Sequence, residues 1–442
     1  MDYRGKTVLV VGMGKSGVAA LELLTSVGAR VLATDSRPLA DLGEAAAVIA
    51  RLNLGFVPQN AVAFQGVDLI VVSPGVPLDL EELEQARAEG IAVTGELELA
   101  AEFLRGPNIG ITGANGKTTT TALVGHILRE CGIACQVGGN IGWPPAAMVG
   151  SSRADQWNVL ELSSFQLETI AAFRAEIGVC LNVTPDHLDR HKTFEAYAAA
   201  KRRLFETQRP GDWAVLNADD ATTRGFTRAI ASTPVWFSQR RRVDGMWVDG
   251  GDILWNGQLL MPVSEIPLRG RHNVENVMAA AAAAKLAGAP LDGIRAAVGG
   301  FAGVEHRLEF VRELRGVKYF NDSKATNVDA ALKAIDAFDG GLWIILGGKD
   351  KGSDYAPLAG SLKGKARAAL LIGAAADKIA AQIGGSVPLI ECGTLDAAVR
   401  RASEGALRGD TVLLAPACAS FDQFRNYEER GRLFKTLVNG IV

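Results

Sequence analysis

Short runs of apolar residues alternate with amphipathic segments along the whole chain, and this alternation predicts an α/β protein. Each apolar run is followed by a glycine-rich or polar loop and then by a helical pattern. This order is typical of open parallel sheets whose strands are connected by helices. The predicted strands are Thr7–Val11, Arg30–Thr34, Leu69–Val72, Ile109–Thr112, Trp157–Leu160, Gly178–Val183, Val317–Asn321, Leu342–Leu346, Ala369–Ile372 and Val412–Ala415.

The chain has 442 residues, which exceeds what one hydrophobic core usually supports, so several domains are expected. We predict a Rossmann-like domain over residues 1–97, a central parallel-sheet domain over residues 98–302, and a second Rossmann-like domain over residues 303–442. The last boundary falls in the glycine-rich stretch Val298–Gly303. Residues 212–267 have the pattern of short strands and turns and are expected to form a β-rich excursion.

Composition and charge exclude several classes of function. The formal net charge is −3 and no basic run is present, so a nucleic-acid partner is not expected. The five cysteines form no C-x-x-C pair, which favours reduced thiols in a cytoplasmic protein. The apolar stretch near the N-terminus is too short for a signal peptide, and the alanine-rich run Met278–Ala284 is too short for a membrane span. We therefore expect a cytoplasmic protein without membrane insertion.

The most specific signal is a phosphate loop between the strand Ile109–Thr112 and a helix predicted over Thr118–Leu128. The segment from Gly110 reads G-I-T-G-A-N-G-K-T and fits the phosphate-loop pattern with its first glycine shifted by one residue. Glycines let backbone N–H groups surround an anion, and the helix N-terminus adds its positive dipole end. Lys117 would reach the β- and γ-phosphates and the Thr118 hydroxyl would ligate Mg²⁺. The central domain is therefore predicted to bind ATP or GTP.

A second glycine-rich loop, Gly12–Gly17, follows the first strand. It matches G-x-G-x-x-G, and Asp35 ends the next strand, as in dinucleotide-binding folds. Taken alone, this fingerprint leaves NAD and another nucleotide-like ligand open. The turn Ser73-Pro74-Gly75 follows a third strand of the same domain and is placed to line the same crevice.

Further polar residues follow the strands of the central domain. Glu161 ends a strand beside the phosphate loop, where an acid that directs Mg²⁺ belongs, although a surface or capping acid is the alternative. His187 lies on a post-strand loop of the same sheet, which favours a metal or catalytic role over that of a satisfied polar residue. Asn140 lies in a tight glycine loop that need be only a turn. Tyr197 and Lys201 are four apart on one face of a predicted helix, and such a lysine is ordinarily solvated.

Three polar clusters of the last domain also follow predicted strands, and their positions describe the rim of an active site. The clusters are Asn321–Thr326, Gly347–Lys351 and Pro416–Phe421. Before them, Asn273 and Asn276 lie three apart on the first turn of an alanine-rich helix, where capping explains at most one of the two amides.

Taken together, the motifs resemble those of the Mur ligases, and the closest similarity is to the members that add D-glutamate. The resemblance extends from about Val8 to Gly431 and rests on G-I-T-G-A-N-G-K-T-T-T, G-G-N-I-G, E-L-S-S-F-Q-L-E, N-V-T-P-D-H-L-D-R-H, G-R-H-N-V-E-N, E-H-R-L-E, N-D-S-K-A-T-N and S-F-D-Q-F-R-N-Y-E-E-R-G. It implies an ATP-dependent amide ligase that adds D-glutamate to UDP-N-acetylmuramoyl-L-alanine through an acyl phosphate, in cytoplasmic peptidoglycan synthesis. It also implies a monomer whose third domain closes on ATP.

The resemblance implies a role for each matching residue, and it replaces NAD by the UDP substrate in the first domain. The implied UDP-substrate residues are Gly14, Lys15, Ser16, Asp35, Ser36, Arg37, Ser73, Pro74, Gly75, Asn140 and His187. The implied ATP residues are Gly113, Asn115, Gly116, Lys117, Thr118, Thr119, Asn273, Asn276, Arg307, Asp322 and Lys324. The implied D-glutamate residues are Thr326, Lys351, Ser420, Phe421 and Tyr427.

By the same resemblance, the catalytic set is Lys117, Glu161, His187 and Lys201, with two Mg²⁺ ions for which Mn²⁺ is an alternative. Thr118 and Glu161 would hold the first ion, and His187 would hold the second together with Lys201 carrying a CO₂-derived carbamate. Three details depart from the family pattern or are ambiguous. Lys349 competes with Lys351 for the glutamate, Tyr427 stands where a Phe is expected, and the segment before Tyr197 is one residue short.

The residues leave two alternative functions open. The first is a sibling ligase that adds another amino acid, or a ligase similar to folylpolyglutamate synthase. The second is a phosphate-loop regulator or an NAD-binding protein without ligase chemistry, although the third-domain motifs argue against it.

Overall fold

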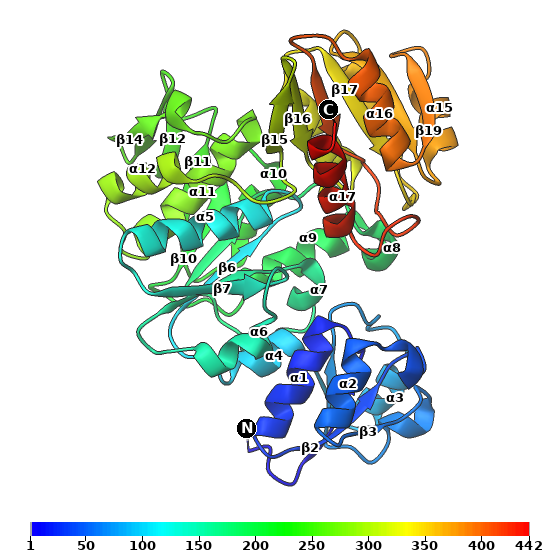
Figure 1. Cartoon of the computed structure of the whole chain (residues 1–442). Helices are drawn as coiled ribbons and strands as arrows, with labels where there is room; N and C mark the ends of the chain where they lie inside the picture. Colours follow the sequence, from blue (N-terminus) through cyan, green and yellow to red (C-terminus); the bar gives the residue numbers. More distant parts are fainter. Residues whose placement is uncertain (1, 442) are drawn as a thin grey trace. The chain divides into compact units, whose positions relative to one another are not determined.

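The computed structural model describes residues 2–441, which form three β-sheets with flanking helices (Figure 1). The chain divides into two compact units. The first contains the residues up to Glu265 together with Glu275–Gly299, and the second contains Ile266–Val274 together with the residues from Gly300 on. The predicted α/β class with parallel sheets is confirmed, whereas the boundaries at residues 97 and 302 stay predictions.

The first sheet of unit 1 has the strand order β3-β2-β1-β4-β5 and is parallel throughout. Val8 and Val10 of β1 pack into one core, and Leu9 and Val11 pack into another on the opposite face. A strand buried on both faces needs a continuous apolar run, which is what the sequence has there. The strands are β1 (Thr7–Val11), β2 (Arg30–Thr34), β3 (Gly55–Phe56), β4 (Leu69–Val72) and β5 (Ala92–Gly95), and the helices are α1 (Lys15–Ser26), α2 (Glu44–Arg51), α3 (Glu81–Ala88) and α4 (Glu96–Ala101).

The second sheet of unit 1 has nine strands in the order β14-β13-β12-β11-β10-β9-β6-β8-β7. In this order β6 lies between β8 and β9, so the loops that follow these three strands meet at one edge. The strands from β10 onward continue the same sheet, so the β-rich excursion predicted for residues 212–267 is an extension of it, ending in the antiparallel strands β12, β13 and β14. The strands are β6 (Asn108–Thr112), β7 (Cys135–Gly139), β8 (Trp157–Glu161), β9 (Ile177–Cys180), β10 (Trp213–Asn217), β11 (Thr233–Ser238), β12 (Gly245–Asp249), β13 (Asp252–Trp255) and β14 (Gln258–Pro262).

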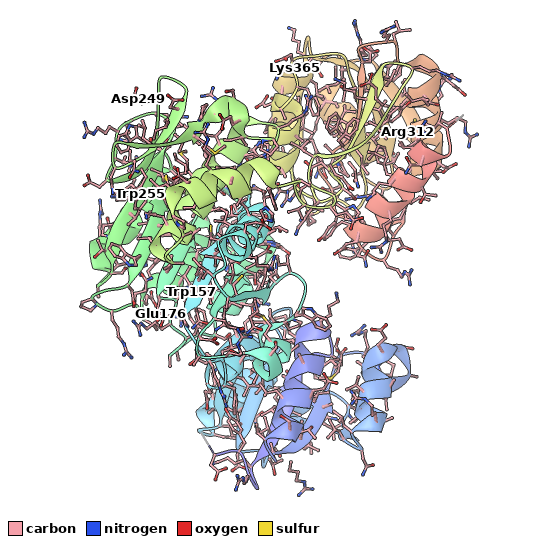
Figure 2. The ribbon with its side chains drawn as sticks, turned by 60° about the vertical axis from the view of Figure 1, so that its left-hand side comes forward. Trp157, Glu176, Asp249, Trp255, Arg312 and Lys365 are labelled. Carbon is pink, nitrogen blue, oxygen red and sulfur yellow. The ribbon has the colours of Figure 1, made fainter. Side chains whose placement is uncertain are left out.

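Trp157 and Glu176 mark the opposite, amino-terminal edge of this sheet (Figure 2). There the Glu176 carboxylate accepts a hydrogen bond from the Asn108 backbone N–H at 2.7 Å, which fixes the start of β6. The helix α5 packs on β6, β7 and β8. The helices of this part are α5 (Lys117–Glu130), α6 (Pro145–Met148), α7 (Ser164–Leu167), α8 (Leu188–His191), α9 (Phe194–Arg202), α10 (Ala221–Gly225) and α12 (Leu291–Gly300), while α11 (Arg271–Leu286) begins in unit 2 and continues in unit 1.

The sheet of unit 2 has the order β15-β16-β20-β17-β18-β19, with only the edge strand β15 antiparallel. Helices α13, α14 and α15 pack over one face and α16 and α17 over the other. The strands are β15 (Glu309–Leu314), β16 (Val317–Asn321), β17 (Leu342–Gly347), β18 (Ala366–Ile372), β19 (Leu389–Gly393) and β20 (Thr411–Leu414). The helices are α13 (Val328–Asp336), α14 (Ala356–Leu362), α15 (Ala376–Ile383), α16 (Leu395–Gly405) and α17 (Tyr427–Asn439).

Several predicted elements differ from the structure at their ends. The strand predicted over Gly178–Val183 is shorter and ends at Cys180, because the following residues turn toward the phosphate loop. The phosphate-loop helix begins at Lys117 and α1 begins at Lys15, so each helix starts before the first residue of its apolar pattern. Among residues 2–441, no helix combines the length and the apolar character that a membrane span needs.

Candidate active site

The phosphate loop leads from β6 to α5 through two glycines in conformations that side chains rarely adopt. Gly113 has φ = 146° and Gly116 has φ = 90°. A Cβ atom at Gly116 would lie 2.2 Å from Oδ1 of Asn276, so a side chain has no room there. The backbone therefore curls tightly ahead of the helix, which is the arrangement that presents N–H groups to a phosphate.

Two lysines meet at the carbonyl oxygen of Gly113. Lys117 Nζ donates to this oxygen at 2.9 Å and to the Ala114 carbonyl at 2.8 Å. Lys201 Nζ, which comes from α9, donates to the same Gly113 oxygen at 2.8 Å. The helical pattern around Lys201 is that of an ordinarily solvated lysine, while the resemblance placed this residue in the catalytic set; in the structure it is part of the phosphate-loop cluster.

Lys201 is 1% exposed, and its ammonium lies 4.4 Å from the centre of the Tyr197 ring, as the four-residue spacing predicted. Burial, followed by the positive charge of Lys117, lowers the pKa of Lys201 to about 7. Charged lysines are rarely buried without a carboxylate partner, because desolvation favours the neutral amine. A substantial neutral fraction at physiological pH makes this amine nucleophilic.

Glu161, at the end of β8, is 1% exposed and joins two other predicted residues. Its Oε2 accepts from the Thr118 hydroxyl at 2.7 Å, and its Oε1 accepts from Asn140 Nδ2 at 3.0 Å. A buried carboxylate beside a hydroxyl at the mouth of a phosphate loop provides the oxygen ligands that Mg²⁺ prefers. The residues present therefore fit the ion that the sequence predicted.

Asn182 is a residue that sequence analysis missed. It follows β9, and its side chain exchanges hydrogen bonds with Asn115: Oδ1 accepts from the Asn115 backbone N–H at 2.9 Å, and Nδ2 donates to the Asn115 carbonyl at 3.1 Å. On the other side of the loop, Thr120 donates to Oδ1 of Asn276 at 3.4 Å. The only signal for Asn182 in the sequence was its place at the head of the motif that carries His187.

His187 lies in the left-handed region, with φ = 53°, and its side chain is 40% exposed. Its ring packs edge-on against Phe165 with centroids 4.9 Å apart, and its Nε2 lies 3.7 Å from Oδ2 of Asp186. The neighbouring His191 is buried instead, with Nε2 at 2.9 Å from the Ser164 hydroxyl. The exposed ring of His187 is the one that remains accessible to a ligand.

In the first sheet, the glycine-rich loop after β1 meets the turn after β4. The Ser73 hydroxyl donates to the Gly12 carbonyl at 2.6 Å, and a Cβ atom on Gly17 would lie 1.9 Å from that carbonyl oxygen. The two loops thus meet where the strand order reverses, which is the position where open α/β sheets bind ligands.

Asp35 shapes this loop with both carboxylate oxygens. Oδ2 accepts from the Met13 backbone N–H at 2.7 Å, and Oδ1 accepts from Arg37 Nε at 3.0 Å. Burial raises the pKa of Asp35, but the hydrogen bonds from Arg37 and Met13 outweigh it and hold the pKa below its usual value. The other predicted residues of this region, Gly14, Lys15, Ser36, Pro74 and Gly75, are exposed or half-buried beside it, as is Ser16.

A small cavity in unit 1 joins the turn after β4 to the second sheet. Ser73 and Pro74 line it from the first sheet, and Phe165, Gln166 and Arg190 line it from the second. Arg190 is held there by Glu168, whose Oε2 accepts from its Nη2 at 2.8 Å. The cavity thus brings the predicted UDP-substrate turn close to the motif that contains Phe165.

In unit 2, Arg307 and Asp322 carry buried polar atoms that find no hydrogen-bond partner among the described residues, namely Nε of Arg307 and Oδ1 of Asp322. Burial raises the pKa of Asp322 to about 6, against the opposing charges of Arg307 and Lys324. Such atoms are costly unless a ligand satisfies them. Lys324 lies 5.3 Å from the centre of the Tyr427 ring.

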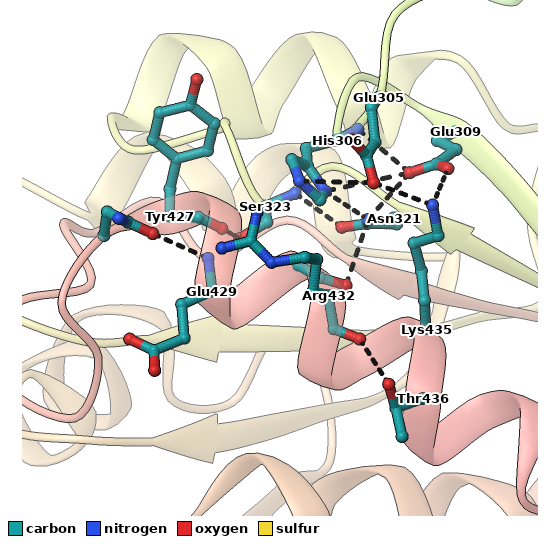
Figure 3. A network of polar contacts seen from close by, with 12 residues as sticks. Glu305, His306, Glu309, Asn321, Ser323, Tyr427, Glu429, Arg432, Lys435 and Thr436 are labelled. Carbon is teal, nitrogen blue, oxygen red and sulfur yellow. Dashed lines mark hydrogen bonds and ion pairs between the residues drawn. The ribbon is translucent and has the colours of Figure 1, made fainter.

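The segment that carries Arg307 is anchored by a polar network (Figure 3). Lys435 of α17 donates to Glu305 at 3.0 Å and to Glu309 at 2.6 Å. Glu309 Oε2 also accepts from Nδ2 of Asn321, which lies 2.9 Å from His306 Nδ1. Because Arg307 directly follows His306, this network fixes the backbone from which Arg307 extends.

The three polar clusters predicted for the last domain do meet at one edge, because β16, β20 and β17 are neighbours. Arg430, fully buried, ties two of them together: its guanidinium donates to the Ser323 carbonyl at 2.9 Å and to the Cys418 carbonyl at 3.2 Å. Ser420 is 2% exposed and Phe421 is 67% exposed. Thr326 and Tyr427 are half-buried, and Lys349 and Lys351 are both exposed.

Comparison with known proteins decides the family. Three family models match the chain in order: "Mur ligase MurD-like, N-terminal domain" over residues 6–95, "Mur ligase middle domain" over residues 111–284, and "Mur ligase, glutamate ligase domain" over residues 306–418. A protein of Solibacter usitatus named UDP-N-acetylmuramoylalanine–D-glutamate ligase is 61% identical over 442 residues, covering 100% of this chain and 99% of the relative. The chain belongs to the Mur ligase family.

Two further similarities agree with this assignment. A protein of the same name from Acidobacterium capsulatum is 53% identical, covering 99% of this chain and 97% of the relative. The crystal structure of the ligase MurC from Thermotoga maritima shares the fold, with a TM-score of 0.62 at 19% identity, and the match covers 98% of this chain and 99% of that one. The three-domain Mur ligase architecture predicted from the motifs is thereby confirmed.

The structure of this Mur ligase brings together some predicted residues and leaves others apart. Lys117, Thr118, Glu161, Asn140 and Lys201 form one continuous cluster. Asn273 and Asn276 do not act alike, since Asn273 Nδ2 donates to the Arg269 carbonyl at 2.6 Å, as a helix-start contact, while Asn276 faces the phosphate loop. Their joint contact with a ligand stays a prediction.

Proposed function

We propose that this protein joins D-glutamate to the carboxylate of UDP-N-acetylmuramoyl-L-alanine with ATP as the source of activation, in cytoplasmic peptidoglycan synthesis. The main support is the full-length relationship to proteins named UDP-N-acetylmuramoylalanine–D-glutamate ligase. The supporting geometry is the phosphate loop, with Lys117 and Lys201 on one carbonyl and Thr118 on the Glu161 carboxylate. The proposal takes the protein to be a monomer, which sedimentation would test.

The reaction needs activation because a carboxylate does not form an amide directly. A carboxylate oxygen of the UDP substrate attacks the γ-phosphorus of ATP, the bond to the β-phosphate oxygen breaks, and ADP leaves. The amine nitrogen of D-glutamate then attacks the carbonyl carbon of the acyl phosphate. The resulting tetrahedral carbon expels inorganic phosphate, the nitrogen loses a proton, and the amide remains.

Lys117 is proposed to offset charge on the transferring phosphoryl group, and its place at the start of α5 in the phosphate loop supports this. The loop amides around Gly113 and Gly116 bind the phosphates, and Asn115 is held in place for this by Asn182. Thr118 and Glu161 would hold Mg²⁺, which would supply positive charge against the phosphates. Asn140 orients the Glu161 carboxylate through its 3.0 Å hydrogen bond.

Lys201 is proposed to act as a carbamate rather than as a cation. Its neutral amine nitrogen would attack the carbon of CO₂ and release one proton, which turns the neutral amine into an anion with two oxygen atoms. The supports are its burial and its pKa of about 7. With His187, this group would hold a second cation, because oxygen and imidazole atoms are metal ligands.

In unit 2, Arg307, Asp322 and Lys324 are proposed to bind ATP, and the unsatisfied buried atoms of the first two support this. Thr326, Lys351, Ser420, Phe421 and Tyr427 are proposed to bind D-glutamate. In unit 1, the loop at Gly14–Ser16, the residues Asp35–Arg37 and the turn at Ser73–Gly75 are proposed to bind the UDP end of the other substrate.

The deciding experiment measures phosphate release with UDP-N-acetylmuramoyl-L-alanine, ATP and a panel of amino acids. We expect release with D-glutamate and not with L-glutamate, D-alanine, L-lysine or meso-diaminopimelate. Release with another member of the panel would show a sibling ligase, and release with a folate acceptor and L-glutamate would show a ligase of the folylpolyglutamate type. An NAD titration serves as the control for the fingerprint at Gly12–Gly17.

A further inference from the structure

The carboxylate of Asp350 collects four hydrogen bonds in the loop that follows β17. Its Oδ1 accepts from the backbone N–H groups of Gly352 and Ser353, each at 3.1 Å, and from the Tyr355 hydroxyl at 2.8 Å. Its Oδ2 accepts from Lys378 Nζ of α15 at 2.8 Å. One side chain therefore defines both the turn at Gly352 and the attachment of this turn to a helix.

Tyr355 extends the hydrogen-bond network of Asp350 to the loop that follows β20. The tyrosine is fully buried, and its hydroxyl lies 3.0 Å from the buried Sγ of Cys418. The two loops are also joined directly, since the Lys349 backbone N–H donates to the Ala419 carbonyl at 2.9 Å. The loop after β17 and the segment that leads to Ser420 are thus held against each other at two places.

The charge of Asp350 is stabilised by these contacts. Burial raises the pKa of Asp350, but hydrogen bonds from Lys378, Tyr355 and the Ser353 amide outweigh it, so the pKa lies below its usual value. The group is therefore an anion at neutral pH, and its contact with Lys378 is a charge-assisted hydrogen bond, the stronger kind.

Lys351 lies inside the turn that Asp350 defines, between Asp350 and Gly352. Among the described residues its side chain is exposed and makes no hydrogen bond or ion pair. A long exposed side chain is not held by packing, so the position of its ammonium depends on the backbone beneath it. The contacts that hold the backbone of this turn therefore also determine where the Lys351 ammonium can bind an anionic ligand.

We propose that Asp350, together with Tyr355 and Lys378, is a positioning residue for the amino-acid substrate. It holds the Lys351 turn against the loop of Ser420 and Phe421, so that the Lys351 ammonium and the Ser420 hydroxyl converge on one carboxylate of the amino acid. This inference rests on the proposed function, because it takes these two residues to bind D-glutamate. Asp350 itself does not touch the substrate.

The test compares graded variants in steady-state kinetics. Asp350→Ala removes all four hydrogen bonds and should raise the apparent KM for D-glutamate at least tenfold. Asp350→Asn keeps an oxygen for the turn amides and Tyr355 but loses the charge facing Lys378, so a smaller rise is expected. Lys378→Met should match Asp350→Asn, and Tyr355→Phe, which retains the packing, should give a rise of a few-fold.

The control is Asp336→Asn, which removes an exposed ion pair to Lys365 at 3.3 Å elsewhere in unit 2. It should leave all constants unchanged. In the Asp350 variants, the apparent KM for ATP and for the UDP substrate should stay within twofold of the wild type, and so should kcat at saturating D-glutamate. This separation is the readout that a general loss of folding would not give.

Two outcomes would overturn the inference: an unchanged KM for D-glutamate in Asp350→Ala, or equal rises in the KM values of all three substrates. Either result would show that Asp350 stabilises the fold and does not position the amino-acid substrate. A wild-type protein that releases no phosphate with D-glutamate would instead overturn the proposed function. The two failures are therefore distinguished by the wild-type measurement.

Discussion

Lys117 and Lys201 donate to the same oxygen atom, the carbonyl of Gly113, at 2.9 and 2.8 Å. Two ammonium groups on one acceptor repel each other. The half-buried Lys117 keeps its charge more easily than the fully buried Lys201, since burial disfavours a charged group. The arrangement therefore favours a cationic Lys117 and a neutral Lys201.

The first prediction concerns Lys117. Lys117→Ala should lower the rate of phosphate release by at least two orders of magnitude, because one preorganised charge on a transferring phosphoryl group is worth about 3 kcal/mol. Binding of the UDP substrate, measured by calorimetry, should be nearly unchanged because it uses the first sheet. A variant that retained more than half of the wild-type rate would contradict this role.

The second prediction concerns the anionic role of Lys201. Lys201→Ala should be nearly inactive, and acetate should partly restore it because a small carboxylate can occupy the vacated space and supply oxygen ligands. Phosphate release at increasing acetate concentration measures this. Acetate added to Lys117→Ala is the matched control and should have no effect, since that position needs a cation. If acetate fails to rescue Lys201→Ala, the carbamate proposal is wrong.

The third prediction concerns pH. With the pKa of Lys201 lowered to about 7 from 10.5, the neutral amine is the minor form below pH 7 and the major form above it. At constant dissolved ¹³CO₂, the carbamate signal in carbon NMR should therefore rise as pH increases through about 7. Lys117→Ala removes the second cause of the shift, so its midpoint should move to higher pH. A signal independent of pH between 6 and 9 would count against the assignment.

The fourth prediction concerns amino-acid binding. Ser420→Ala and Thr326→Ala each remove a hydroxyl that is proposed to bond a charged ligand, an interaction worth about 1.5–3 kcal/mol. Each should raise the apparent KM for D-glutamate by more than tenfold and the KM for ATP by much less. Equal rises in both constants would mean that these residues organise the loops instead.

The fifth prediction concerns Glu96, which begins α4 and is 1% exposed. Its Oε1 accepts from the Ala146 N–H at 2.6 Å, while its buried Oε2 has no hydrogen-bond partner among the described residues. Burial raises the pKa of Glu96 from 4.5 to about 8. Between pH 4.5 and 8 the carboxyl group is therefore protonated in the folded state and ionised in the unfolded state. The contribution of this group to the free energy of unfolding is fully present below pH 4.5 and is lost as pH rises through 8.

Glu96→Gln keeps the acceptor for Ala146 and removes the titration. Its apparent Tm should exceed that of the wild type at pH 9, and the difference should shrink as pH falls toward 5. Glu44→Gln, an exposed change at the start of α2, is the control and should show no such trend. A constant Tm difference across this range would show that Glu96 ionises normally.

The sequence by itself determined the class of fold and the motifs of the site. The apolar runs within Thr7–Val11 and Leu69–Val72 marked their strands to the residue, because a strand buried on both faces is built almost entirely of apolar residues. The phosphate loop was equally clear, since its glycines and its Lys-Thr pair follow from local backbone geometry. Local periodicity did not show that residues 212–267 continue the central sheet, because strand order depends on pairing between distant segments.

Only the tertiary structure decided which polar residues act together. Lys201 has the sequence environment of a solvated helical lysine, and its burial on the Gly113 carbonyl results from the packing of α9 beside the phosphate loop. Asn182 and Arg430 were given no role for the same reason: their hydrogen-bond partners are backbone groups of other loops, and no spacing in the sequence encodes such contacts. Asp350 belongs to a predicted polar cluster, but its contacts with Tyr355 and Lys378 are visible only in the folded structure. A pKa likewise depends on burial and neighbouring charge in three dimensions, so the neutral state of Lys201 exists only once the chain has folded.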